Sequence, residues 1–266
     1  MIVFAGITPH PPLLVPGVGK GEEKNVKNTF LAMEKFARDL AETEPDLVII
    51  VSPHMIHFPH MFNVCGMSNL YGSFANFGSP DYEWHGKNDP EFAAEIVDQA
   101  EGAGLPALLF DAEGEYEVDH GVMVPLHFIR EAVDYSFKVL PISYSIASRA
   151  NHYSFGQMIA EVAERRRDLR VAIIASGDLS HRLVPGQTNE AAEFDKSLVE
   201  LIKKGDDFSI ANMEEESVEQ AGECGYRSIL ILLGALSGRD YSPEVYSYEG
   251  PFGVGYMVAN MKIKES

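Results

Sequence analysis

Short uninterrupted apolar runs alternate along this chain with longer segments in which apolar residues recur every three or four positions. The uninterrupted runs predict buried β-strands, and they cover residues 2–7, 46–51, 106–110, 137–142 and 171–175. The periodic segments predict helices with one buried face, and they cover residues 22–42, 90–102, 155–167 and 190–203. This alternation predicts an α/β fold: a three-layer sandwich whose central, mostly parallel or mixed sheet carries helices on both faces.

Two further segments refine this prediction. Residues 244–248 and 254–262 read as strands with no helix between them, which favours an antiparallel addition and therefore a mixed sheet. Residues 68–88 form the least regular segment, and their length suits either a lid or specificity loop or a packed Ω-loop. No linker divides the chain, so residues 1–266 are expected to form one domain.

Composition and charge narrow the range of partners. The 266 residues are 45% hydrophobic, enough for a large core, and 40 acidic against 21 basic residues give a formal net charge of −19. We expect neither a nucleic-acid nor a membrane partner, because anionic surfaces require clustered Lys and Arg. Two cysteines, no basic leader and no apolar stretch long enough to span a bilayer favour a soluble, cytoplasmic protein.

Two histidines occupy alike positions, each just after a predicted buried strand. His10 follows the first strand and His54 follows the strand that ends at Val51. Each comes directly after a proline, which stiffens the backbone that carries it. Because ligands collect at the carboxyl ends of strands in open α/β sheets, this pair suggests a metal site.

Two more histidines lie in similar contexts, in Asp119-His120-Gly121 at a predicted helix start and in Ser176-Gly177-Asp178-Leu179-Ser180-His181 after a predicted strand. All four can face one cleft. The remaining five histidines, for which packing or a surface position is sufficient, are His57, His60, His85, His127 and His152.

A third metal ligand is available from the neighbouring Glu223 and Cys224, which precede an apolar helix. Two histidines and a carboxylate form the facial triad that binds Fe(II) and leaves positions open. Two histidines and a thiolate favour zinc or copper instead. A helix-terminal acid and a small buried hydrophobe explain the two residues equally well one at a time.

These motifs resemble those of the class III extradiol ring-cleavage dioxygenases, the superfamily of the protocatechuate 4,5-dioxygenase catalytic subunit, the aminophenol dioxygenases and the DOPA dioxygenases. The similarity runs in order from residue 8 to about residue 236. The segments that carry it are Thr8-Pro9-His10-Pro11-Pro12, Ser52-Pro53-His54, Asp119 to Leu126 and Ser176 to His181.

The resemblance implies that residues 1–266 form a single catalytic domain of this type, with His10, His54 and Glu223 as iron ligands. It also implies acid-base roles for His120 and His181. Asp119 and Asp178 are candidates for orienting neighbouring side chains, or else for capping helices. Arg149, Arg182 and Arg227 are candidates for pairing with a substrate carboxylate, with surface solvation as the alternative.

The family also includes Memo-like proteins, and the segment Cys224-Gly225-Tyr226-Arg227 resembles theirs. In that branch Cys224 would replace or accompany Glu223. We therefore expect an Fe(II) dioxygenase that opens the ring of a small aromatic, catechol- or aminophenol-type substrate with O2. The sequence leaves open whether a partner subunit closes the cleft. The alternatives are a Memo-like metal-binding protein and a zinc hydrolase on the same scaffold. Zinc or another divalent metal, and a homo-oligomer, are also compatible with this sequence.

Overall fold

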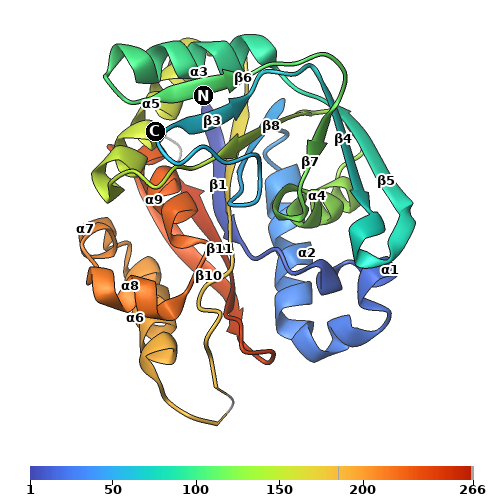
Figure 1. The fold of residues 1–266 in the computed structure, drawn as a ribbon, viewed down its shortest axis with the longest axis vertical. Helices are drawn as coiled ribbons and strands as arrows, with labels where there is room; N and C mark the ends of the chain where they lie inside the picture. Colours follow the sequence, from blue (N-terminus) through green and yellow to red (C-terminus); the bar gives the residue numbers. More distant parts are fainter. Residues whose placement is uncertain (185, 265–266) are drawn as a thin grey trace.

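The computed structural model describes residues 1–184 and 186–264, and its centre is an eight-stranded sheet (Figure 1). The strand order is β10-β11-β1-β9-β2-β8-β3-β6. The strands are β1 (Ile2–Thr8), β2 (Leu47–Val51), β3 (Phe62–Cys65), β6 (Ala107–Phe110), β8 (Lys138–Ser143), β9 (Val171–Ser176), β10 (Tyr241–Glu249) and β11 (Tyr256–Ile263).

The sheet is mixed. Its four middle strands, β1, β9, β2 and β8, run parallel, whereas β11 pairs antiparallel with β1 and β10 pairs antiparallel with β11. On the other side β3 pairs antiparallel with β8 and parallel with β6. The predicted α/β class and the antiparallel addition of the last two strands are therefore confirmed. The parallel strands are buried on both faces, which explains their uninterrupted apolar sequences.

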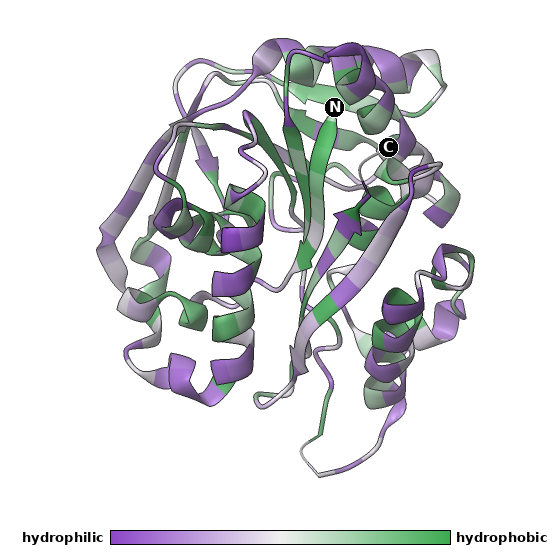
Figure 2. Cartoon of the chain, turned by 180° about the vertical axis from the view of Figure 1, so that it is seen from behind, coloured by the Kyte–Doolittle hydropathy of each residue, from purple (hydrophilic) through white to green (hydrophobic). Residues whose placement is uncertain are grey.

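Helices cover both faces of this sheet (Figures 1 and 2). One core cluster joins the sheet to α2 (Lys27–Ala41) and α4 (His120–Ala132). The cluster on the opposite face joins it to α3 (Pro90–Gly102), α5 (Arg149–Arg165), α6 (Glu190–Lys204) and α9 (Tyr226–Ala235). This arrangement is the three-layer sandwich that the sequence predicts.

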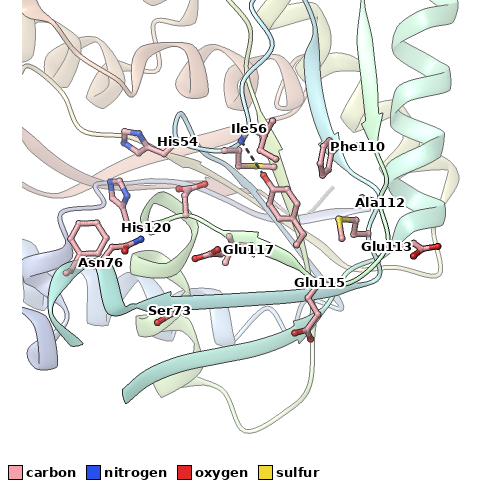
Figure 3. Close-up of a pocket in the computed structure, with 16 residues that line it drawn as sticks. His54, Ile56, Ser73, Asn76, Phe110, Ala112, Glu113, Glu115, Glu117 and His120 are labelled. Atoms are coloured by element: carbon pink, nitrogen blue, oxygen red, sulfur yellow. Dashed lines mark hydrogen bonds between the residues drawn. The ribbon is translucent and has the colours of Figure 1, made fainter. Parts of the chain in front are cut away.

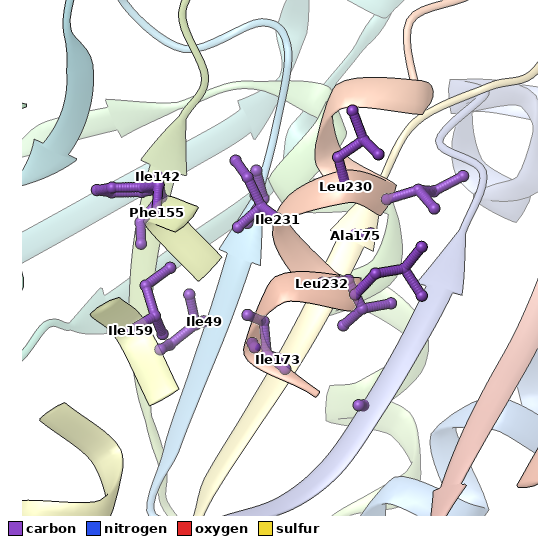
Figure 4. Packing of buried hydrophobic residues seen from close by; sticks show 14 of the residues in the cluster. Ile49, Ile142, Phe155, Ile159, Ile173, Ala175, Leu230, Ile231 and Leu232 are labelled. Atoms are coloured by element: carbon purple, nitrogen blue, oxygen red, sulfur yellow. The ribbon is translucent and has the colours of Figure 1, made fainter. Parts of the chain in front are cut away.

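Helix α9 is the most deeply buried helix of the second layer. Residues 228–235 are all buried, and Figure 4 shows Leu230, Ile231 and Leu232 packed beside Phe155 of α5 and the sheet residue Ile173. The two helices cross closely because glycines face each backbone: a Cβ on Gly156 would lie 1.9 Å from the carbonyl oxygen of Ile231. A helix that is apolar on every side is stable only in such a position.

A second sheet of three strands stands apart from the first, in the order β5-β4-β7. It comprises β4 (Asn69–Phe74), β5 (Ser79–Lys87) and β7 (Tyr116–Val118), with the 3-10 turn η3 (Ala75–Phe77) between β4 and β5. The segment 68–88 is thus a regular antiparallel hairpin rather than an irregular loop. Its signal was the alternation in β4, where every second side chain is buried.

Short elements complete the described chain: η1 (Pro12–Leu14), α1 (Pro16–Gly19), η2 (Glu22–Val26), α7 (Asp207–Ala211) and α8 (Glu215–Ala221). The predicted helix 22–42 therefore divides into η2 and α2. Over residues 1–184 and 186–264, none of the helices combines the length and the apolar character needed to cross a bilayer.

Candidate metal centre

Three histidines from separate elements meet at the carboxyl ends of the parallel strands. His10 follows β1, His54 follows β2, and β9 lies between these two strands. His120 is the first residue of α4. One ring nitrogen from each histidine lies within 4.8 Å of the others, and this is the one such group of three or more potential metal ligands in the described residues. We call His10, His54 and His120 the three-histidine group.

The spacing within the group suits a metal ion. The Nε2 atoms of His10 and His54 are 3.1 Å apart, and the rings of His54 and His120 stack with centroids 4.3 Å apart. Two nitrogens that each lie about 2.1 Å from a metal ion, at an angle of 90° to 110°, are separated by about 3.0–3.4 Å. The His10–His54 pair therefore has the separation of two ligands on one cation.

A serine from the strand between them fixes the tautomer of His10. The Ser176 hydroxyl donates to the carbonyl oxygen of Gly121 at 2.5 Å, so it is free to accept a hydrogen bond from Nδ1–H of His10 at 3.0 Å. The proton on Nδ1 leaves the lone pair of Nε2 facing His54. Such a hydrogen bond on the far nitrogen is the usual way in which proteins orient a metal-binding histidine.

Asp119 and Ser52 hold the other two histidines. The Asp119 Oδ1 accepts from the Ser52 hydroxyl at 2.7 Å and from the backbone N–H of Gly121 at 2.6 Å, so it caps α4. The N–H of His54 donates to the same Ser52 hydroxyl. The Asp119 Oδ2 is buried and has no hydrogen-bond partner among the described residues. Burial raises the pKa of Asp119, and the neighbouring His54 opposes this shift.

Asp178 and Cys224 adjoin His10 from the opposite side. The Asp178 Oδ1 accepts from the backbone N–H of His10 at 2.9 Å, and the Asp178 N–H donates to the Cys224 sulfur at 3.2 Å. That sulfur lies 3.6 Å from Nε2 of His10. The contact requires glycine at position 177, where a Cβ would lie 2.2 Å from the Cα of Gly225. Asp178 therefore orients the His10 loop and does not cap a helix.

Glu223 lies next to this cluster but outside the three-histidine group. Its carboxylate accepts a hydrogen bond from the N–H of Tyr226 at the start of α9. Burial raises the pKa of Glu223 to about 7, although the N–H of Tyr226 and the charge of Arg227 oppose this shift. The thiol of Cys224, and not the carboxylate of Glu223, is thus the side-chain group seen against His10.

Burial favours the neutral form of the three histidines, which is the form that binds metals. Burial lowers the pKa of His10, and positive charge on His54, His120 or His181 would lower it further. Burial likewise lowers the pKa of His54, and it lowers that of His120 to about 4. Burial and the nearby Asp178 raise the pKa of the Cys224 thiol, so a metal would have to displace its proton.

The remaining predicted site residues are more exposed or directed elsewhere. His181 is exposed, and it belongs neither to the three-histidine group nor to the lining of the cavity described next. Arg182 donates to the carbonyl oxygen of Gln220 and Arg149 to that of Met213, while Arg227 lies over the Tyr144 ring. These three arginines do not line the cavity described next.

A cavity of about 570 Å³ opens beside the three-histidine group (Figure 3). His54 and His120 form one end of it, and Phe77 lies with its ring centroid 5.3 Å from that of His120. Tyr116 and Phe110 add further aromatic wall, and the Tyr116 hydroxyl accepts from the N–H of Ile56. The volume of this cavity lies in the range of small-molecule sites.

Sequence reasoning missed several residues that build this site. Ser52 and Ser176 belong to the motifs, but their role in orienting the histidine loops was not predicted. The signal that could have revealed it is a hydroxyl side chain directly at the end of a strand. Phe77 and the cavity wall of β7 carried no local signal, because their proximity to the histidines depends on how the small sheet docks.

Comparison with protein families decides the relationship. The family described as the catalytic LigB subunit of aromatic ring-opening dioxygenase matches residues 5–259. The chain belongs to this family. The resemblance seen in the sequence motifs is thereby confirmed over almost the whole chain.

Relatives in this family have diverse names. A Clostridium acetobutylicum protein is 38% identical over 96% of this chain, which spans only 56% of that relative's length. The Escherichia coli 3,4-dihydroxyphenylacetate 2,3-dioxygenase is 29% identical, over 93% of this chain and 94% of its own length. A MEMO1 family protein of Methanosarcina barkeri is 29% identical over 52% of this chain and 51% of its own.

A solved structure shares the fold. An uncharacterized protein of Escherichia coli K12 superposes with a TM-score of 0.60 at 19% sequence identity, over 85% of this chain and 91% of that one. The chain therefore belongs to a family of ring-opening dioxygenases and carries a potential metal site in its three-histidine group.

Proposed function

We propose that this protein is an Fe(II)-dependent extradiol dioxygenase that opens the ring of a catechol- or aminophenol-type aromatic with O2. The observation that carries the proposal is the three-histidine group at the end of a cavity large enough for one aromatic ring. Membership of the ring-opening dioxygenase family and the similarity to a 3,4-dihydroxyphenylacetate dioxygenase support it.

The donor set fits a divalent metal. His10 and His54 would hold it through their Nε2 atoms, and the third donor would come from Glu223, Cys224 or His120. Fe(II) held there supplies the redox chemistry that allows dioxygen to react with an electron-rich ring. Zinc would fit the same nitrogen donors, so metal identity is part of the test.

The chain's own residues would bind and deprotonate the substrate. Phe77 and Tyr116 would bind the ring in the cavity. His181 would carry protons to and from the substrate hydroxyls, and so would His120 where Glu223 or Cys224 is the third donor, since a neutral imidazole accepts a proton and an imidazolium returns it. In the overall reaction one ring C–C bond next to a hydroxyl-bearing carbon breaks, and both atoms of O2 enter the product.

Oxygen uptake tests the proposal directly. Protein loaded anaerobically with Fe(II) should consume one O2 per molecule of a catechol or 2-aminophenol and yield a ring-opened product, detected by mass spectrometry. His181→Ala should retain iron and lose turnover by about 100-fold or more, since general acid-base catalysis typically contributes about 10²–10⁴-fold. Bound iron with no oxygen consumption on any member of the panel would overturn the proposal.

A second candidate, a Memo-like metal-binding protein without dioxygenase activity, is favoured by one observation. The Cys224 sulfur faces His10, whereas the Glu223 carboxylate is hydrogen-bonded to the backbone of α9. Under this alternative Cys224→Ala should lose the metal and Glu223→Ala should retain it. The dioxygenase proposal with a Glu223 ligand expects the reverse, measured as metal content per chain after dialysis.

A further inference from the structure

One wall of the cavity carries a row of carboxylates that lead to the three-histidine group. Glu115, Glu117 and Asp119 alternate with the buried Tyr116 and Val118 along β7 and its flanks, and all five residues line the cavity. Glu113 lines the same cavity farther out. Figure 3 shows Glu117 between Glu115 and His120. We call Glu113, Glu115, Glu117 and Asp119 the carboxylate row.

Basic residues do not balance this row inside the cavity. Among the described residues that line it, none is Lys or Arg. His85 lies 3.4 Å from Glu115 at the exposed end, whereas the described contacts contain no ion pair to Glu113 or Glu117. The whole chain is also strongly acidic, with a formal net charge of −19. The carboxylates along β7 therefore favour a cationic group over a carboxylate on this side of the cavity, away from the metal end.

The inner end of the row offers an unused acceptor. Asp119 lines the cavity. Its Oδ2 atom is buried and has no hydrogen-bond partner in residues 1–184 and 186–264. A buried carboxylate oxygen without a donor is costly, and a ligand that brings an N–H or O–H group removes that cost.

We propose that the cavity selects aromatic substrates that carry an ammonium group and discriminates against carboxylated ones. The ring would lie between Phe77 and the histidines, and the ammonium group would extend along β7 toward Glu117 and Glu115. This inference rests on the proposed function for the identity of the ring. It separates this chain from the relative that is named for 3,4-dihydroxyphenylacetate, a substrate with a carboxylate.

Binding of three probes to the Fe(II)-loaded protein under anaerobic conditions tests the inference without turnover. Dopamine, 3,4-dihydroxyphenylacetate and 4-ethylcatechol share the catechol and differ in the charge of a short side chain. At low salt dopamine should bind at least about tenfold more tightly than 3,4-dihydroxyphenylacetate, with 4-ethylcatechol between them. The ratio of the two dissociation constants should shrink as salt is added, because salt screens the interaction between exposed charges. The screening length is about 10 Å at 0.1 M salt.

Variants of β7 locate the effect. Glu117→Gln should reduce the dopamine preference by about two- to fivefold, the contribution of one exposed ion pair. Glu117→Lys should invert the order of dopamine and 3,4-dihydroxyphenylacetate. Glu101→Gln removes the same charge from the exposed end of α3, at a residue that does not line the cavity, and should leave the ratio unchanged.

The outcomes separate this inference from the proposed function. A persistent dopamine preference without oxygen uptake supports the inference and overturns the dioxygenase proposal alone. Ring opening with equal affinities, or with tighter binding of 3,4-dihydroxyphenylacetate, overturns the inference alone. An equal change in Glu117→Gln and Glu101→Gln would attribute the preference to net charge and overturn the role of the carboxylate row, as would the failure of dopamine to bind.

Discussion

The two sheets of this protein contribute differently to the candidate site. The eight-stranded sheet supplies His10 and His54 from the ends of its buried parallel strands, and serines at those ends hydrogen-bond to the residues of both loops. The three-stranded sheet supplies the cavity wall, in which the carboxylates of β7 are exposed and mostly unpaired. The large sheet thus carries two of the three histidines of the candidate metal centre, whereas the small sheet lines the cavity that leads to it.

His120 lies where the two regions join. It directly follows the β7 segment of the small sheet and begins α4, which packs on β9 of the large sheet and on β4 of the small one. The close contact of Gly121 with Ser52 shows how tightly this junction is built, since a Cβ at position 121 would lie 2.3 Å from the Ser52 hydroxyl oxygen. Away from this junction, changes in the large sheet should affect metal binding, and changes in the small sheet should affect ligand binding.

Removal of a metal donor from the large sheet should give the largest effect. His10→Ala and His54→Ala should each weaken metal affinity by more than about 100-fold, because loss of a group that merely orients a ligand already costs about 10–100-fold. Metal content after dialysis against a weak chelator measures this. His85→Ala, at an exposed position of the small sheet, is the matched control and should retain the metal. Full occupancy in both donor variants would contradict the proposed centre.

Loss of the His10 orienting group should have an intermediate effect. Ser176→Ala removes the acceptor that holds the Nδ1 proton of His10, so both tautomers become available and metal affinity should fall by about 10–100-fold. Competition titration with a metal indicator measures the change. Ser143→Ala alters a buried hydroxyl at the end of β8 that donates to the carbonyl oxygen of Tyr144, and it should bind metal as the parent does. Equal affinity in the two variants would remove Ser176 from the site.

The sequence predicted the large sheet better than the small one for a physical reason. Strands such as Leu47–Val51 are buried on both faces and appear as continuous apolar runs, so they and the histidines after them were identified. The short strands β3 and β7 and the hairpin β4–β5 contain polar and glycine residues, and their strand character depends on tertiary pairing.

The same difference limits prediction of the site. That His10 and His54 converge follows from their shared position at parallel strand ends, a rule of the fold. Which side chain of the Glu223-Cys224 pair faces His10 depends instead on the local turn before α9, where the close approach of Gly177 and Gly225 brings the thiol to 3.6 Å. The periodicity of the sequence carries no information about such a contact. The sequence therefore could not decide between Glu223 and Cys224 as the third metal ligand.

A change confined to the small sheet should have the smallest effect. Phe77 follows β4, is 39% exposed, and packs edge-on against the His120 ring, so Phe77→Ala removes one aromatic wall of the cavity and no metal donor. Affinity for 4-ethylcatechol, a neutral probe that does not sense the carboxylate row, should fall by about two- to tenfold, since an aromatic pair contributes about 0.5–1.5 kcal/mol. Metal affinity should stay within about twofold of the parent protein.

Phe252→Ala is the matched control for this variant, because Phe252 is 46% exposed and lies outside the cavity lining, in the turn between β10 and β11. Anaerobic titration of both variants compares them directly. If Phe77→Ala released the metal as His54→Ala is expected to, the ring contacts from Phe77 through His120 to His54 would couple the sheets, and the small sheet would help to build the metal centre. If ligand affinity alone fell, the division between a metal-holding sheet and a ligand-selecting sheet would stand, because the variant would have changed the second without the first.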